Sequence, residues 1–514
     1  MRRTALTGLL LALSSPVLAA GPEPIDDLQR LFIEDTVALI NPPSADAGSR
    51  ARALMDEAVA ARASGDLSAM RRKLAEARVI LGKGEWTADT ALLHSLAIRP
   101  DRVVADPSRE LTVDVAQRFR ADRAGGDLRL TLGLRARGKP EIDWRVRVSK
   151  VSGDMIDSPV RLHLPLTGLA DGSYDIVLRA SEGEREIGVT TLGLWIVTGL
   201  DRDLAALGAT PASAGRPKSV AMALAWPENL ARTMNARMRQ PLDVDWRTLL
   251  DRTRALAGSD GTAFMQARGV MERIYPNSAS HRLEPYRLFI PESWDGRSAL
   301  PLVVLLHGSN ADHTRAFASG KAVEAARKRG WALLSPMGYS PNSGWGNHLP
   351  VVLANGTMPA PRPSTINGVV LPRDGVTPEP AEVDVFEALA DMQANYPIDT
   401  KRIYLAGNSM GGEGTWHLAQ KVPSLWAAVA PGAGAIDPAH YPYQRLGTLP
   451  VLAVHGDADP IISFAASAEM IDRLNRAGGK GQLLRVAGGG HSSFDPSLDR
   501  IFDFFAKHSR KERP

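Results

Sequence analysis

The spacing of hydrophobic residues changes from a helical to a strand period and back again along this chain. Over residues 21–100, apolar side chains recur every three or four positions, which is the period of a helix with one buried face. The clearest such set is Leu67, Met70, Leu74, Ala77 and Leu81. Asp66 precedes this set as an expected N-cap, and Gly82 follows it as an expected stop. The pattern predicts an N-terminal helical segment over residues 21–100.

A strict alternation of apolar and other residues replaces the helical period beyond residue 100. It is clearest in three runs that glycine-containing turns separate: residues 128–134, 142–148 and 174–178. Alternating strands punctuated by turns predict a small antiparallel β-sandwich over residues 101–198. The helical period then returns and predicts a helical connector over residues 199–269.

The last part of the chain, residues 270–514, contains short apolar runs that do not alternate. They are residues 302–306, 332–335, 402–406, 426–430, 451–454 and 483–486. Helical patterns lie between them. Continuous apolar strands that alternate with helices are typical of a mostly parallel sheet covered by helices on both faces. We therefore predict an α/β domain here. The sequence shows no repeat with a period of a few tens of residues, which argues against a propeller.

The first twenty residues have a pattern of their own. A cationic start, MRR, is followed by the apolar run TALTGLLLAL and then by the small residues of SSPVLAA. This is the pattern of a secretory signal peptide, and we expect cleavage after Ala19 or Ala20. The apolar run is too short to span a bilayer. The sequence therefore predicts a periplasmic or secreted protein; the alternative is an uncleaved N-terminal anchor.

Charge, cysteine content and motifs exclude several classes of protein. The formal net charge is only +4 over 514 residues, which is too small to predict nucleic acid as a partner. The chain has no cysteine, so it can form no disulfide and use no thiolate. The motif HExxH and a phosphate-binding Gly-Lys-Ser/Thr motif do not occur, and GGEGTW lacks the third glycine of a dinucleotide loop. We expect no metal, no cofactor and no membrane span.

The candidate chemistry begins with RIYLAGNSMGGEGTW, residues 402–416. An apolar strand, a glycine-rich turn and a helical pattern follow one another, which is the arrangement of a nucleophile elbow. Gly407 and Gly411 would leave room for the sharp turn, and Ser409 would lie at its apex. The alternative is a glycine-rich strand-to-helix turn whose serine has no role. A catalytic serine needs a base and an orienting acid, so the alternatives differ in what lies downstream.

The histidines after Ser409 leave one good candidate for the base. His491 lies in GGGH, directly after the last apolar run, where a loop reaches the carboxyl edge of the sheet. Four other histidines have less suitable settings in a helix, a proline-flanked loop, a strand end and the charged tail: His417, His440, His455 and His508. His455 is expected to shape its turn. In this fold class the acid precedes the histidine, and Asp459 is the favoured acid, with Asp457 as the alternative.

A serine nucleophile would form a tetrahedral intermediate, and the oxyanion of that intermediate needs backbone N–H donors. Met410 follows the serine at the start of a helix and supplies one expected N–H group. The second is expected from the loop that follows the apolar run in LVVLLHGSN, where Ser309 is favoured and Gly308 is the alternative. The candidate substrate-binding residues are Trp345, His307 and Asn408.

Four segments together resemble the α/β-hydrolase superfamily: LLHGSN, AEVDVFEALADMQANYPIDTKRIYLAGNSMGGEGTWHLA, VHGDAD and GGGH. Within it, residues 270–510 resemble secreted esterases related to prolyl oligopeptidase-like and feruloyl-esterase-like serine hydrolases. The resemblance implies an α/β-hydrolase domain and an acyl-serine mechanism. It also implies that Ser409, Asp459 and His491 form the triad, and that Ser309 and Met410 donate to the oxyanion.

The N-terminal half departs from prolyl oligopeptidases, because it lacks the blade repeats of a propeller. A helical segment and a small sandwich instead resemble the N-terminal part of esterases that carry an immunoglobulin-like domain before the hydrolase. This favours a small-molecule or polymer-linked ester as substrate. Two alternatives are a serine peptidase of the prolyl oligopeptidase type and a non-catalytic binding protein with a hydrolase fold. For the N-terminal domains we expect a role in homo-oligomerisation or substrate presentation.

One long connection interrupts the α/β pattern. Residues 343–380 contain seven prolines and few charges, and so long a connection within a compact domain is usually functional or disordered. We predict that residues 349–378 form a cap over the acyl pocket, with Trp345 and His348 at its hinge; the alternative is a disordered insertion. Glu382 and Asp384 open the next helix, where we expect a structural role.

Overall fold

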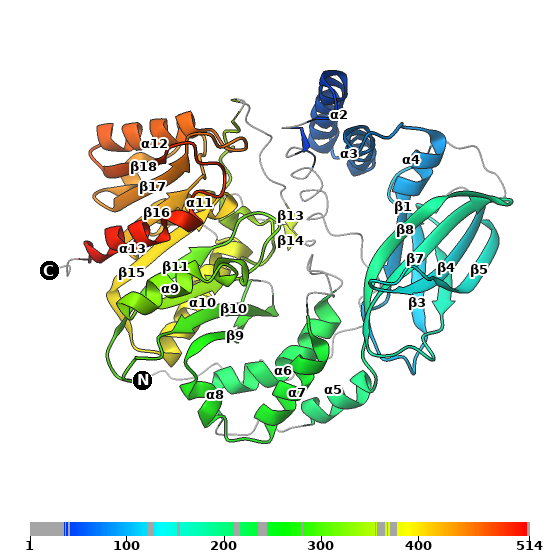
Figure 1. Cartoon of the computed structure of the whole chain (residues 1–514), viewed down its shortest axis with the longest axis horizontal. Coiled ribbons are helices and arrows are strands. Elements are labelled where there is room, and N and C mark those ends of the chain that lie inside the picture. Colours follow the sequence, from blue (N-terminus) through cyan, green and yellow to red (C-terminus); the bar gives the residue numbers. More distant parts are fainter. Residues whose placement is uncertain are drawn as a thin grey trace, which may run out of the picture.

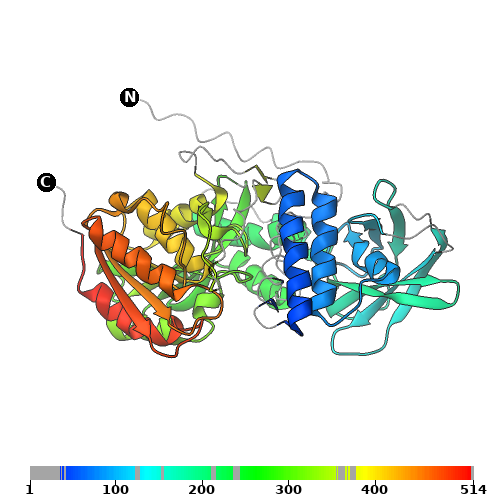
Figure 2. The same ribbon diagram turned by 90° about the horizontal axis from the view of Figure 1, so that it is seen from above.

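The computed structural model describes residues 35, 38–39, 42–121, 128–151, 155–209, 216–234, 244–279, 281–354, 356, 365–366, 369–370 and 378–510. The expected signal peptide lies outside these residues. Figures 1 and 2 show an α/β unit at one end of the molecule and small β-sheets at the other, with α5–α8 joining them. Within the described residues, no helix is long and apolar enough to cross a membrane.

The N-terminal helices form a hairpin with a core of its own. It consists of α2 (Ala45–Ala63) and α3 (Leu67–Leu81), each opened by a side-chain cap, from Ser44 and Asp66. The apolar stripe identified in the sequence is the face along which the two helices pack. In both views the hairpin stands between the two larger units. A third helix, α4 (Ala88–Ser95), leads into the first strand.

Two sheets follow and enclose one hydrophobic core. The three-stranded sheet has the order β1-β3-β6: β1 (Leu96–Pro100), β3 (Leu111–Gln117) and β6 (Val160–Leu164). The five-stranded sheet has the order β2-β8-β7-β4-β5: β2 (Val104–Ala105), β8 (Arg185–Ile196), β7 (Gly172–Glu182), β4 (Leu128–Ala136) and β5 (Asp143–Val151). The alternating leucines of β4 are buried between these sheets. The immunoglobulin-like assignment stays a prediction.

Two details of this region differ from the sequence prediction. The first strand begins at Leu96, inside the segment predicted to be helical, because the chain turns extended there and pairs with β3. The sheets are also not wholly antiparallel, since β2 runs parallel to β8. Both differences depend on pairing partners that are distant in the sequence, which local periodicity does not report.

The connector contains four helices: α5 (Leu200–Gly208), α6 (Lys218–Thr233), α7 (Trp246–Ala257) and α8 (Thr262–Gln266). Its core is shared with both neighbours. Val197 at the end of β8, Trp226 and Trp246 of the connector, and Ile274 of the α/β unit belong to one cluster of buried apolar side chains. The connector is therefore packed against both units rather than strung between them as a loose linker.

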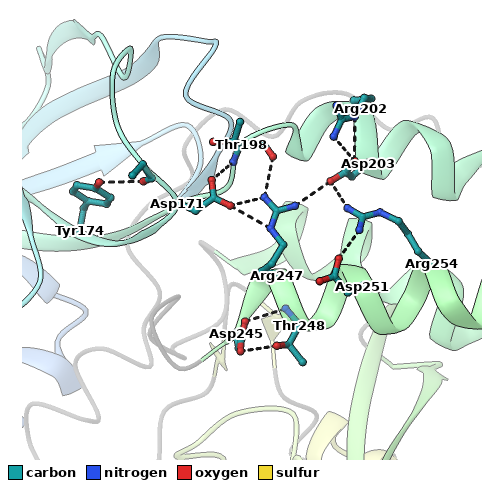
Figure 3. A network of polar contacts seen from close by, with 11 residues as sticks. Asp171, Tyr174, Thr198, Arg202, Asp203, Asp245, Arg247, Thr248, Asp251 and Arg254 are labelled. Atoms are coloured by element: carbon teal, nitrogen blue, oxygen red, sulfur yellow. Dashed lines mark hydrogen bonds and ion pairs between the residues drawn. The ribbon is translucent and has the colours of Figure 1, made fainter.

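An ion network joins the connector to the β-sheets (Figure 3). Arg247 of α7 donates to the carboxylate of Asp171, to the carbonyl of Thr198 at 2.9 Å and to Asp203 of α5 at 3.4 Å. Arg254 donates to the same oxygen of Asp203, whose carboxylate is 6% exposed. Burial raises the pKa of Asp171, but hydrogen bonds from Thr198 and Arg247 outweigh it and lower this pKa. The buried carboxylate of Asp203 is tolerated because several arginine donors surround it.

The α/β unit is built on one eight-stranded sheet with the order β18-β17-β16-β15-β11-β12-β10-β9. Its strands are β9 (Gly269–Asn277), β10 (Arg282–Ile290), β11 (Leu300–Leu306), β12 (Ala332–Pro336), β15 (Ile398–Asn408), β16 (Ala428–Gly432), β17 (Pro450–Gly456) and β18 (Lys480–Val486). From β12 to β18 neighbouring strands are parallel, whereas β10 is antiparallel to both β9 and β12.

Helices cover both faces of this sheet. One face packs against α10 (Pro380–Asn395), α11 (Met410–Lys421) and α12 (Phe464–Arg476), and the other against α9 (Lys321–Arg329) and α13 (Leu498–Ala506). The chain passes from β11 to β12 on one side and later returns to β15 on the other side of β11. The carboxyl ends of β11 and β15 therefore meet where the strand order reverses, which is where α/β sheets place their ligand sites.

Candidate active site

Ser409 occupies the sharp turn between β15 and α11. Its φ of 59° and ψ of −123° are rare for a residue with a side chain. Two backbone hydrogen bonds hold it there: its N–H donates to Gly432 at 2.9 Å, and its carbonyl accepts from Glu413 at 3.0 Å. Strained backbone that the surroundings enforce is concentrated at functional sites. The local geometry is that of a nucleophile elbow.

Two glycines make this turn possible. A Cβ atom at Gly407 would lie 2.6 Å from the carbonyl oxygen of Gly411, and one at Gly411 would lie 2.2 Å from that of Leu306. These neighbours are backbone atoms of the turn itself and of β11, so they cannot move aside as a flexible side chain would. The helix after Ser409 consequently lies directly against the end of β11.

Asp459 and His491 come from two further loops at the same edge of the sheet. Asp459 follows β17 and His491 follows β18. The imidazole Nδ1 lies 2.8 Å from Asp459 Oδ2, so Nδ1–H donates to the carboxylate and Nε2 is the atom left for a reacting group. The imidazole is 20% exposed, whereas the carboxylate is fully buried.

The histidine loop is attached to the elbow through Asn408. The side-chain amide of Asn408 donates to the carbonyl oxygen of His491 at 3.2 Å. Asn408 immediately precedes Ser409, so this bond holds the loop of His491 beside the serine. The observed amide contact of Asn408 lies within the site, and its predicted role in substrate binding stays a prediction.

The alternative acid, Asp457, points elsewhere. Its carboxylate accepts from Arg485 at 2.7 Å and from the N–H of Gly488 at 2.7 Å. These hydrogen bonds lower the pKa of Asp457, but they hold the carboxylate at the end of β18. Of the two candidates, Asp459 is the one that the structure brings to His491.

The environment of Asp459 keeps it ionised. Burial raises its pKa, but hydrogen bonds from His455 and His491 and from the backbone N–H of Ile461 lower it further than burial raises it. The pKa of Asp459 consequently lies well below the usual range for a carboxyl group. A permanently charged, buried carboxylate is suited to orient an imidazole and to stabilise the imidazolium form.

The loop after β11 borders the elbow on the other side. A Cβ atom built on Gly308 would lie 3.5 Å from Cβ of Ser409. The N–H of Asn310 is committed to Pro341 and to the side chain of Asn342, which leaves Gly308 and Ser309 as the candidate donors of this loop. Met410 is the first residue of α11, where a backbone N–H has no acceptor within the helix.

Trp345 and His307 are both buried next to the elbow. The Trp345 side chain is fully buried, and its indole N–H donates to the carbonyl of His307 at 3.1 Å. His307 is 2% exposed and its ring packs against that of Trp345, with centroids 4.8 Å apart. Burial also lowers the pKa of His307. That these residues contact substrate stays a prediction, which the burial of both side chains does not support.

The remaining histidines have other partners. His417 contacts Glu382 at 2.5 Å, and Lys421 contacts the other oxygen of the same carboxylate at 3.0 Å. Burial raises the pKa of Glu382, but hydrogen bonds from His417, from the N–H of Glu379 and from Lys421 lower it on balance. His348 lies 2.6 Å from Glu379. The acidic residues at the start of α10 thus have the structural role that the sequence predicted.

Residues 350–354, at the start of the segment predicted to form a cap, are described. Residues 350–354 run as an extended segment across the loops after β16 and β17, with Val352 N–H donating to Ala435 and Ser463 N–H donating to Val352. Isolated bridges pair Val351 with Ile436 and Leu353 with Ile462. Most of residues 355–377 lies outside the described residues, and the cap stays a prediction.

His455 is a residue of this site that sequence reasoning missed. We expected it to shape a turn, but it lies within β17, is 1% exposed and approaches Asp459 Oδ2 at 3.2 Å. The signal in the sequence was a histidine at the end of a buried strand, four residues before the acid.

Among the described residues, no cluster of side chains has the composition of a metal site.

A second buried carboxyl group, Asp384, makes stability depend on pH. It accepts from the hydroxyl of Tyr275 and from the N–H of Gly338. Burial, together with the neighbouring Glu284, raises its pKa to about 7. Between the ordinary carboxyl pKa and about 7, the folded protein retains a proton that the unfolded chain has lost, so stability falls as pH rises through this window.

We therefore expect the melting temperature of the wild type to decline between pH 5 and pH 7 and Asp384→Asn to remove part of that decline. Calorimetry at four pH values measures both slopes. A difference of several degrees is expected, because one pKa unit corresponds to about 1.4 kcal/mol and each kcal/mol shifts the midpoint by roughly 2–4 °C. Asp457→Asn is the control, since its carboxyl ionises below this window. Equal slopes for Asp384→Asn and the wild type would contradict the assignment.

Comparisons with known proteins agree with this architecture. Residues 379–509 match the Phospholipase/Carboxylesterase family. A segment of 80 residues is 36% identical to a bifunctional acetylxylan esterase/xylanase of Neocallimastix patriciarum, and one of 89 residues is 35% identical to NocK of Nocardia uniformis subsp. tsuyamanensis, which is described as an esterase. These segments are 16% and 17% of this chain and only 12% and 26% of the two relatives.

Solved structures also align with the chain at low identity. A thermostable esterase covers 78% of this chain and 95% of its own length, with 16% identity and a TM-score of 0.38. A ferulic acid esterase covers 46% of this chain and 97% of its own, with 16% identity and a TM-score of 0.36. On its sheet order and its family match, the C-terminal half has the α/β-hydrolase fold. The resemblance to α/β-hydrolase esterases drawn from the sequence is confirmed.

Proposed function

We propose that this protein is an exported serine esterase that cleaves carboxylic esters through an acyl-serine intermediate. The observation that carries the proposal is one arrangement: a strained Ser409 at a strand-to-helix turn, beside a histidine loop whose imidazole is held by a buried carboxylate. Nucleophile, base and orienting acid are the groups that acyl transfer to serine requires. Export rests on the pattern of residues 1–20.

Each group has one step in the mechanism. Ser409 Oγ attacks the ester carbonyl while His491 Nε2 takes its proton, and the same nitrogen then protonates the departing alcohol. Asp459 keeps Nδ1–H directed toward itself and stabilises the imidazolium form. Water enters by the reverse sequence and releases the acid. The N–H of Met410 and that of Ser309 or Gly308 stabilise the oxyanion, and each such donor contributes about 3–4 kcal/mol to the transition state.

The choice of esters over peptides is supported by the relatives. The two curated relatives that match segments of this chain are named as esterases. The described N-terminal half contains a helical hairpin and two small sheets, which give no sign of the propeller expected of a prolyl oligopeptidase. Small acyl esters, free or attached to a polymer, are therefore the proposed substrate class.

The test is a comparison of bond types with the mature protein, residues 21–514. We expect turnover of a series of short p-nitrophenyl esters, no turnover of a proline-linked p-nitroanilide, and covalent labelling by a fluorophosphonate that mass spectrometry locates on Ser409. Turnover of the anilide alone would replace the esterase by a peptidase. Absence of both turnover and labelling would replace it by a binding protein.

A further inference from the structure

Asp459, the candidate acid of the triad, contacts a second imidazole, that of His455. Its Nε2 lies 3.2 Å from Asp459 Oδ2 and 3.3 Å from the carbonyl oxygen of Ile462. Its Nδ1 lies 2.6 Å from the hydroxyl of Ser467 in the first turn of α12. Strand β17, the loop that carries Asp459 and helix α12 are thus joined through one buried ring.

The partners of this ring determine which nitrogen carries the proton. A carboxylate and a carbonyl can only accept, so Nε2 must donate, whereas the hydroxyl of Ser467 can donate to an unprotonated Nδ1. A neutral imidazole with the proton on Nε2 therefore satisfies all three contacts. The edge of Phe464 packs against the same ring, with centroids 5.8 Å apart.

The consequence is that every oxygen of Asp459 is fixed. Oδ1 accepts from the backbone N–H groups of Ile461 and Ile462 at 2.8 and 3.1 Å. Oδ2 accepts from His491 at 2.8 Å and from His455 at 3.2 Å. Without His455, Oδ2 would have His491 as its only side-chain donor, and the carboxylate would be held toward His491 only through the two backbone N–H groups on Oδ1. The direction in which Asp459 holds His491 thus depends on His455.

We propose that His455, itself oriented by Ser467, is a positioning residue that fixes the carboxylate of Asp459 and thereby the imidazole of His491. This inference rests on the proposed esterase function. It assigns a role in turnover to a residue that never touches substrate. The alternative is that His455 only fills space in β17. The two hypotheses differ in what a substituted side chain must supply: a hydrogen-bond donor at the position of Nε2, or only volume.

Two substitutions at His455 separate these readings. His455→Gln retains an N–H donor near the position of Nε2, whereas His455→Leu retains volume without the donor. We expect His455→Leu to lower kcat by about 10- to 100-fold, the range for a charged group that loses one hydrogen-bond partner, with KM unchanged. We expect His455→Gln to recover most of that loss. Ser467→Ala, which removes only the partner of Nδ1, should lower kcat less. The control is Ser95→Ala, which changes a buried serine at the end of α4 and should not change kcat.

A spectroscopic measurement makes the test independent of turnover. The proton shared by His491 Nδ1 and Asp459 should give a proton NMR resonance far downfield of the amides, and we expect this resonance to shift or vanish in His455→Leu and to return in His455→Gln. An unchanged kcat and resonance in His455→Leu would overturn the inference, as would a His455→Gln variant as impaired as His455→Leu. If His455→Leu does not fold, Ser467→Ala and His455→Gln carry the test: an unshifted resonance in Ser467→Ala would overturn it. Equal turnover by Ser409→Ala and the wild type would instead refute the proposed function, and the resonance would still report on His455.

Discussion

Replacing Ser409 by alanine is expected to lower kcat for p-nitrophenyl ester hydrolysis by at least about 10⁴-fold while the protein remains folded. The reason is the loss of the only atom that forms the acyl bond; the imidazole and the oxyanion donors can then act only on water. Ser409 also has an unusual positive φ, which alanine tolerates about as well as serine. The melting temperature should therefore hardly change. Steady-state kinetics and calorimetry on the same preparations measure both quantities.

The matched control for this prediction is Ser492→Ala. Ser492 is exposed and lies next to His491, so it tests whether any serine near the histidine affects turnover. We expect the control to retain the kcat of the wild type. If Ser409→Ala kept more than a tenth of the wild-type kcat, Ser409 would not be the nucleophile. The interpretation of the turn at Ser409 as a nucleophile elbow would then also be wrong.

The second large effect is expected from Gly411→Ala. The new Cβ would lie 2.2 Å from the carbonyl oxygen of Leu306 and 2.9 Å from that of His307. These are backbone atoms of β11 and of the loop after it, so relief requires α11 to move away from the sheet. Overpacking of this kind costs about 1–3 kcal/mol, and a displacement of about 1 Å at reacting groups can cost about 100-fold in rate. We expect both a lower melting temperature and a kcat/KM reduced by at least that factor.

A second glycine of the same site provides the control for stability. Gly490 precedes His491, and a Cβ atom built on it would meet nothing within 4 Å. Gly490→Ala should therefore leave the melting temperature unchanged. Calorimetry and ester kinetics on the two variants give the comparison. An unaltered melting temperature and kcat/KM in Gly411→Ala would mean that the turn is not packed against β11 as described.

The sequence alone was sufficient to predict the order in which the candidate site residues follow one another along the chain. A buried strand, a glycine-flanked Ser409 and a helix follow within fifteen residues, and that arrangement is local, so periodicity and turn residues are sufficient to predict it. The same holds for His491 on a loop after the last strand and for the change of period that separates the β-sheets from the α/β unit. The choice between Asp457 and Asp459 was narrowed by sequence but decided by the structure, since it depends on which carboxylate faces His491.

Only the tertiary structure decided which polar and aromatic side chains are buried beneath the site. Trp345 and His307 lie in segments that contain glycine and asparagine, yet both side chains are buried. Trp345 packs against Gly414 of α11 and donates a hydrogen bond to the carbonyl of His307. Asn408 contacts His491 on a separate loop, and His455 contacts Ser467 of α12. Strand β2 pairs with β8, which lies near the other end of the β-sheet region in the sequence. Hydrophobic periodicity reports the face that a residue occupies within its own helix or strand. It carries no information on which distant atom that face will meet, because those contacts form only when the elements pack together.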